Sequence, residues 1–119
     1  MAAPNIVSVA NITGNTAVQS VTTSATAIVT NSVASGTVYK INTLIISNID
    51  GTNNADITVD LYRSSTSYII AGTITVPADA SLVVISRENA IYLEEGDALR
   101  CLASADGDLQ AICSYEVIS

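Results

Sequence analysis

Short runs of Val, Ile, Thr and Tyr recur along most of the chain and are separated by clusters of Gly, Asn and Asp. Branched and aromatic side chains favour strands, while Gly, Asn and Asp favour the tight turns that connect them. No window repeats apolar residues at the i, i+3, i+4, i+7 spacing of an amphipathic helix. The pattern therefore predicts an all-β chain, with antiparallel strands that pack as a sandwich.

The strands are clearest after residue 37. They are predicted over Val38 to Ile49, Asp56 to Tyr62, Tyr68 to Val76, Ser81 to Ile85, Ala90 to Leu93, Ala98 to Ser104 and Leu109 to Val117. Alternation between residues 56 and 61 directs Ile57, Val59 and Leu61 inward. It directs Asp56 and Asp60 outward, where we expect a solvated face.

The segment from residue 1 to 35 differs in composition from the rest of the chain, because no charged residue lies in it. One interpretation is two or three strands, with Gly14-Asn15 as a two-residue hairpin turn. The other is an extended arm. An uncharged, β-prone edge invites strand addition by another chain. We therefore expect this segment to lie inside the sandwich or to engage a partner subunit. No linker or repeat is evident, so residues 1–119 are predicted to form a single domain.

The last two predicted strands suggest a hairpin with a three-residue loop, in which Ala105 lies opposite Leu109. That register collects the apolar side chains on one face: Leu99, Cys101, Ala103, Ala111, Cys113, Tyr115 and Val117. It also makes Cys101 and Cys113 cross-strand neighbours. The functional alternatives are a disulfide or a metal pair, although two thiols without His form a poor zinc site. We expect them to be small buried hydrophobes that stay reduced in a cytoplasm.

Composition excludes several classes of function. The 119 residues carry 4 Lys and Arg against 11 Asp and Glu, a net charge of −7, so phosphate backbones and anionic membranes are not attracted. There is no His, which removes catalytic triads, Cys-His pairs and His general bases. No signal-peptide pattern and no apolar run of membrane-spanning length is present. We expect no enzyme, no catalytic residue and no cofactor.

Charged residues make up 13% of the chain, against about 25% in a typical soluble domain. A monomer of this mass exposes roughly 6,000 Å², so charge covers its surface thinly. Neighbouring subunits can cover such faces, which predicts a homo-oligomer. The alternative is a monomer with a neutral polar surface.

Two acidic loops are candidate sites. Asp50, Asn53 and Asp56 supply oxygen ligands of the kind calcium prefers, although Asn, Asp and Gly also build loops for backbone reasons alone. Glu94 and Asp97 are neighbours on a turn expected to be exposed, which does not suit an acid and base pair.

Candidate interface residues come from the uncharged segment and from the strand ends. They are Ile6, Val7, Val9, Ile12, Tyr39, Tyr62 and Arg63. Tyr39, Tyr62 and Tyr68 are expected to pack their rings and leave only the hydroxyls exposed; the alternative is one outer face that stacks sugars. Arg63 and Arg87 are expected to make rim salt bridges or interface contacts.

Several segments carry a resemblance to a known group. They are KINTLIISNIDG at 40–51, VPADASLVVIS at 76–86, IYLEEGD at 91–97, the opening MAAPN at 1–5 and CSYE at 113–116. The sequence resembles small virion structural proteins of tailed cyanobacterial phages. These segments are typical of strands and turns and are not catalytic motifs, so the resemblance supplies no active-site residues.

The resemblance implies a β-sandwich or jelly-roll component of a phage particle, most specifically a capsid decoration (cement) protein that binds the major capsid protein. It implies a trimer on the capsid surface of the virion, made in the host cytoplasm. The acidic turns at 50–56, 94–97 and 106–108 are expected to face the solvent. The alternatives are a neck, tail or fibre component, or a carbohydrate- or calcium-binding module used in host attachment.

Overall fold

The structure is a computed structural model that describes residues 11–119, and this part of the chain is almost entirely β-structure. Its strands are β1 (Ile12–Ser20), β2 (Thr26–Thr30), β3 (Val38–Asn48), β4 (Ala55–Arg63), β5 (Thr66–Val76), β6 (Ser81–Ile85), β7 (Ile91–Leu93), β8 (Ala98–Ala103) and β9 (Leu109–Ile118). A short 3₁₀ helix, η1 (Arg87–Asn89), lies between β6 and β7.

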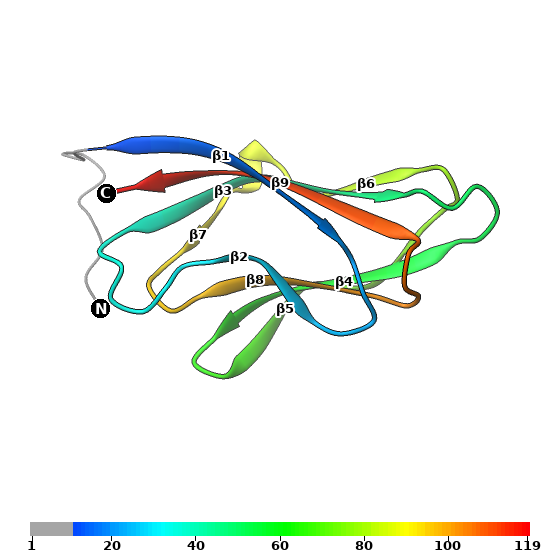
Figure 1. Ribbon diagram of the computed structural model, residues 1–119, viewed down its shortest axis with the longest axis horizontal. Coiled ribbons are helices and arrows are strands. Elements are labelled where there is room, and N and C mark those ends of the chain that lie inside the picture. The colour runs from blue at the N-terminus through cyan, green and yellow to red at the C-terminus, as the bar shows by residue number, and fades with distance from the viewer. Residues whose placement is uncertain (1–10) are drawn as a thin grey trace.

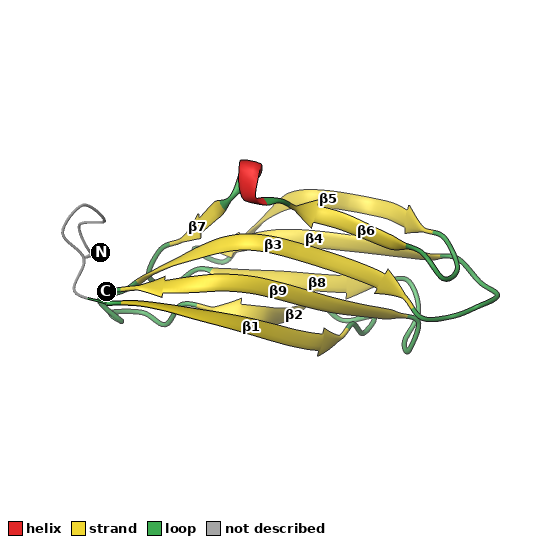
Figure 2. Ribbon diagram, turned by 90° about the horizontal axis from the view of Figure 1, so that it is seen from above, coloured by secondary structure: helices red, strands yellow, loops and turns green. Residues whose placement is uncertain are grey.

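The strands form two antiparallel sheets that pack face to face (Figures 1 and 2). Sheet I has the order β1-β9-β3-β6, and β7 also pairs with β3. Sheet II has the order β2-β8-β4-β5. When β6 and β7 are taken as one strand interrupted by η1, this is the order of an eight-stranded jelly roll. The predicted all-β, jelly-roll-like sandwich is confirmed.

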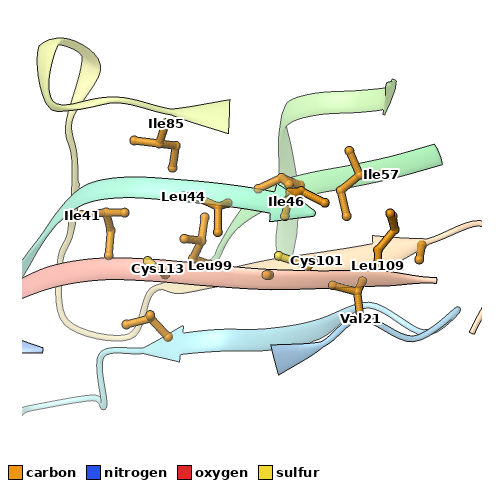
Figure 3. Packing of buried hydrophobic residues seen from close by; sticks show 14 of the residues in the cluster. Val21, Ile41, Leu44, Ile46, Ile57, Ile85, Leu99, Cys101, Leu109 and Cys113 are labelled. Carbon is orange, nitrogen blue, oxygen red and sulfur yellow. The ribbon is translucent and has the colours of Figure 1, made fainter. Parts of the chain in front are cut away.

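The core lies between the sheets and is built by alternation along each strand (Figure 3). Ile57 and Val59 point inward from β4 and are fully buried. In β3 the buried residues include Ile41, Leu44 and Ile46, so the alternation slips by one residue between Ile41 and Leu44. A bulge against β9 between residues 41 and 43 absorbs that extra residue. Each fully buried Ile or Leu contributes about 1.5–3 kcal/mol relative to an exposed one.

The predicted strands after residue 37 are confirmed to within two residues at each end. The Gly14-Asn15 turn is wrong, because both residues lie inside β1 and pair with Glu116 and Tyr115 of β9. The chain turns after Ser20 instead, where Val21 is buried and carries the chain from sheet I to sheet II. The described part of the uncharged segment is thus a part of the sandwich, in which β1 and β2 are edge strands of the two sheets.

The hairpin predicted from the last two strands is wrong. β8 pairs with β2 and β4 in sheet II, while β9 pairs with β1 and β3 in sheet I. The chain between them therefore crosses from one sheet to the other (Figure 1). Cys101 and Cys113 both lie in the core but come from opposite sheets (Figure 3). Alternation still showed that both cysteines lie on buried faces. A strand turns the same face to the core whether the other strand pairs with it in one sheet or lies in the opposite sheet.

Candidate interaction surfaces

The outer face of sheet II holds a buried ion pair between Asp60 and Arg100. These residues lie directly opposite each other on β4 and β8. The guanidinium Nε donates to Asp60 Oδ1 at 3.0 Å and Nη2 donates to Oδ2 at 2.7 Å. The Ser67 hydroxyl also donates to Asp60, and the Tyr62 ring lies 3.9 Å from the Arg100 guanidinium carbon. Asp60 is only 6% exposed, so the expected solvated position is wrong: it is on the outer side but covered by its partners.

The Arg100 guanidinium holds the pKa of the Asp60 carboxyl below its usual value, and this outweighs the opposing effect of burial. The same contact raises the pKa of Arg100. Because Asp60 is ionised and neutralised by its neighbour, this part of the outer face presents a compensated pair to solvent rather than a free charge.

A second ion pair closes one end of the sandwich. Arg63 Nε donates to Asp97 Oδ1 at 2.8 Å and Nη2 donates to Oδ2 at 2.5 Å, while Glu94 Oε2 lies 2.8 Å from the same Nη2. Asp97 is 1% exposed and Glu95 is 7% exposed, with Glu95 accepting a hydrogen bond from the backbone N–H of Gly36. The expectation that the 94–97 turn faces solvent is therefore wrong for these two residues. The N–H of Gly36 in the loop between β2 and β3 binds Glu95, while the N–H of Glu94 and the guanidinium of Arg63 bind Asp97.

Two buried asparagines, Asn31 and Asn48, were not expected from the sequence and anchor the loops. Asn31 Nδ2 donates to the carbonyls of Thr37 and Leu93, both at 3.0 Å. Asn48 Nδ2 donates to the carbonyls of Asn53 and Val76, both at 2.9 Å, and its Oδ1 accepts from the N–H of Asp50. Asn48 ends β3, and Asn31 immediately follows β2. In both cases a polar residue stands where the alternation predicts an inward side chain, and this was the available signal of a buried hydrogen-bonding role.

The candidate calcium residues lie in and beside the loop between β3 and β4. Asp50 accepts hydrogen bonds from the N–H groups of Thr52 and Asn53, and the first of these lowers its pKa most. Asp56 instead accepts from the Thr75 hydroxyl on β5. The two carboxylates thus have different partners, and Asn53 binds Asp50 through its side chain. Within residues 11–119, no group of three or more His, Cys, Asp or Glu is placed to hold a metal ion. Calcium binding stays a prediction.

The tyrosines do not share one outer face. Tyr39 lies in sheet I and stacks on Tyr115 at a centroid distance of 5.5 Å. Tyr62 and Tyr68 lie in sheet II, where Tyr62 contacts Arg100 and Tyr68 is 54% exposed. The alternative of a three-tyrosine surface is wrong, because β3 and β4 belong to different sheets. Of the other interface candidates, Ile12 is 56% exposed at the start of β1, while Ile6, Val7 and Val9 lie outside the described residues.

The outer face of sheet I carries a line of aliphatic side chains that we name the aliphatic row. It consists of Val18, Ile112, Ile45 and Val83, one from each of β1, β9, β3 and β6. Each residue lies directly opposite the next in the sheet register, so the row crosses all four strands that Figure 2 shows side by side. Val18 is 74% exposed, Val83 58% and Ile112 42%, while Ile45 is half-buried.

Both thiols are free and buried. Burial raises the pKa of Cys101 and of Cys113 to about 12, so both remain protonated at neutral pH. A protonated buried thiol is neither a nucleophile nor a metal ligand. In residues 11–119, no helix is long and apolar enough to cross a membrane.

No family model matches the sequence, and no curated protein matches it. The fold is similar to a solved structure from Bacillus, described as an endospore appendage of a family of disulfide-linked pili. The TM-score is 0.52 at 14% sequence identity, and the likeness covers 91% of this chain and 88% of that chain. At this identity the likeness concerns the all-β fold alone.

Proposed function

We propose that this chain is a non-enzymatic structural subunit of a phage particle. Its most specific role is that of a capsid decoration protein, which binds the lattice of the major capsid protein and forms a trimer on the virion surface. The observation that carries the proposal is the apolar area exposed on both sheets. The aliphatic row lies on sheet I, while Tyr68, Ile69 and Ile74 of β5 are exposed on sheet II, so apolar surface is left for protein to cover.

The chemistry of the described residues supports a structural role. The chain has no His, and burial keeps Cys101 and Cys113 protonated. Asp60 and Asp97 are held by arginines. A general base or nucleophile needs a free, suitably tuned group near a cleft. These groups serve the stability of the fold instead.

The N-terminal segment is proposed to add to the contact with the particle. It leads into β1, an edge strand that has a partner on one side only and carries no charged residue. Strand addition along such an edge gives affinity through backbone hydrogen bonds. The candidates Ile6, Val7 and Val9 would then supply side-chain contacts.

Deletion of residues 1–10 tests this role, because it leaves all described strands intact. We expect the truncated protein to keep its far-UV circular dichroism spectrum and to bind purified phage heads at least about tenfold more weakly, a loss of about 1.4 kcal/mol. The full chain is the control in the same co-sedimentation assay. Equal binding by both proteins contradicts the arm, and absence of binding by both contradicts the decoration role.

A fibre subunit is the second candidate, because the similar fold in Bacillus belongs to a pilus. Contacts that do not close on themselves generate filaments, whereas closed symmetric contacts generate rings. Disulfide linkage cannot be carried over, since the chain's two cysteines are both buried in the core. Electron microscopy of the purified protein separates the candidates: filaments support a fibre, and discrete particles support a closed oligomer.

A further inference from the structure

We infer that the outer face of sheet I is a contact surface between two copies of this chain, related by a two-fold axis. The inference goes beyond the proposed attachment to a capsid, because both sides of this contact are the same protein. It rests on the placement of the aliphatic row, on the absence of charge around it, and on a hollow beside one end.

Single exposed apolar residues are common, but a contiguous set is not. The aliphatic row is contiguous, since its residues are paired across neighbouring strands. The positions on either side along the strands are polar but uncharged. They are Thr16, Ser114 and Thr43 on one side, and Ser20, Gln110, Ser47 and Ser81 on the other. This arrangement is an apolar strip with a neutral polar rim, which is the anatomy of a protein interface.

Charge favours a second copy as the occupant. The chain carries a net charge of −7, so two copies repel each other wherever their acidic surfaces meet. The aliphatic row and its rim contain no ionisable group, and farther along the same face Lys40 and Glu116, which have opposite charges, lie opposite each other on β3 and β9. Repulsion is therefore weakest for copies that meet through this face. A basic partner, in contrast, would be drawn to acidic residues and would gain nothing from an uncharged strip.

The shape of the face suggests which residues meet. A hollow of about 300 Å³ lies along the β1 and β9 edge, lined by Val18, Gln19, Ser20, Gln110, Ala111 and Ile112. At the opposite edge of the sheet, Val83 is 58% exposed. A two-fold axis parallel to the strands, between β9 and β3, places Val83 of each copy over Val18 and the hollow of the other. Such a contact is self-complementary and closes as a pair.

The area is enough for a specific but weak contact. The four strands are 5 to 11 residues long and about 4.8 Å apart, so together they give each copy a face of about 600 Å². The pair then buries about 1,200 Å² in total, the lower limit for specific interfaces. We therefore expect dissociation constants in the micromolar range. A three-fold contact on a particle uses other surfaces and adds to this pairing.

The test is the solution mass of the full chain and of charge variants, measured by light scattering after gel filtration. Val18→Asp and Val83→Lys each place a charge in the proposed contact, and both positions are exposed enough to leave folding intact. Val33→Asp is the control, because Val33 is 82% exposed in the loop between β2 and β3. We expect each contact variant to have half the mass of the native protein, and Val33→Asp to match the native protein. Far-UV circular dichroism confirms that each variant is folded.

The double variant Val18→Asp with Val83→Lys tests the axis, because the carboxylate introduced at position 18 of one copy would then face the ammonium group introduced at position 83 of the other. We expect the native mass to be restored. If the native protein and both single variants have equal masses, the proposed contact between copies is overturned. It is overturned as well if their masses are equal and the variants have lost their binding to capsids, because the face then binds the capsid and not a second copy. Halved mass in the single variants without rescue in the double variant overturns the two-fold pairing of positions 18 and 83.

Discussion

Replacement of Asp60 by Asn gives the sharpest test of the ion pair on the outer face of sheet II. The substitution keeps the shape of the side chain but removes its charge. The side chain of Arg100 is 22% exposed and would lose the carboxylate that neutralises it. Removal of one partner from a buried pair costs about 3–5 kcal/mol. Because Arg100 keeps partial solvent access and its contact with Tyr62, we expect the lower end, about 3 kcal/mol.

For 119 residues, an unfolding entropy of about 2.1 cal/mol/K per residue converts about 3 kcal/mol into a fall of about 12 °C in Tm. Differential scanning calorimetry at neutral pH measures it. Glu94→Gln is the matched control, since it also removes a carboxylate beside an arginine. The Glu94 side chain is 46% exposed, so its loss should cost less than about 1 kcal/mol, or about 4 °C.

The pH dependence supplies a second readout. Arg100 lowers the pKa of Asp60 in the folded protein, so the carboxylate stabilises the fold above its unfolded pKa of about 3.9. This stability is lost as the pH falls through the lower folded pKa, where Asp60 takes up a proton. The gap in Tm between native protein and Asp60→Asn should therefore narrow below about pH 4. Equal losses for Asp60→Asn and Glu94→Gln at neutral pH, or a gap that does not change with pH, would refute this interpretation.

Two further predictions concern the interior. Cys101 and Cys113 should not react with a thiol reagent in native protein and should both react after denaturation, because burial raises the pKa of each to about 12; rapid native labelling of either would contradict their placement. Asn48→Ala should lower the free energy of unfolding by about 2–3 kcal/mol, measured by urea titration, since it leaves the carbonyls of Asn53 and Val76 without their donor. The exposed Thr52→Ala is the control, expected to change it by less than about 0.5 kcal/mol.

The strands of the fold could be predicted from the sequence to a large extent, whereas the pairing of the strands within the sheets could not. Alternation located β4, β8 and β9 and identified most of their buried apolar residues, because burial of one face is a local property of a strand. It did not show that β8 and β9 belong to different sheets. A hairpin and a crossing between sheets both satisfy the same inward positions.

The interaction surfaces depend on which residues pair between neighbouring strands, and therefore they could not be predicted from the sequence. Val18 and Val83 are 65 positions apart in the chain and share a row only because β9 and β3 lie between their strands. Asp60 sits at an outward position, which predicts solvation. It is buried because β8 places Arg100 directly opposite. Long-range pairing of this kind leaves no local signal in composition or periodicity.

The central claim is that a chain with so few charges functions with its exposed faces packed against protein. Sedimentation equilibrium of the native full chain tests it most directly, at concentrations up to about 100 µM, well above a micromolar dissociation constant. The expected average mass rises with concentration toward twice the 12.3 kDa of one chain. A mass that stays at 12.3 kDa over the whole range would contradict it.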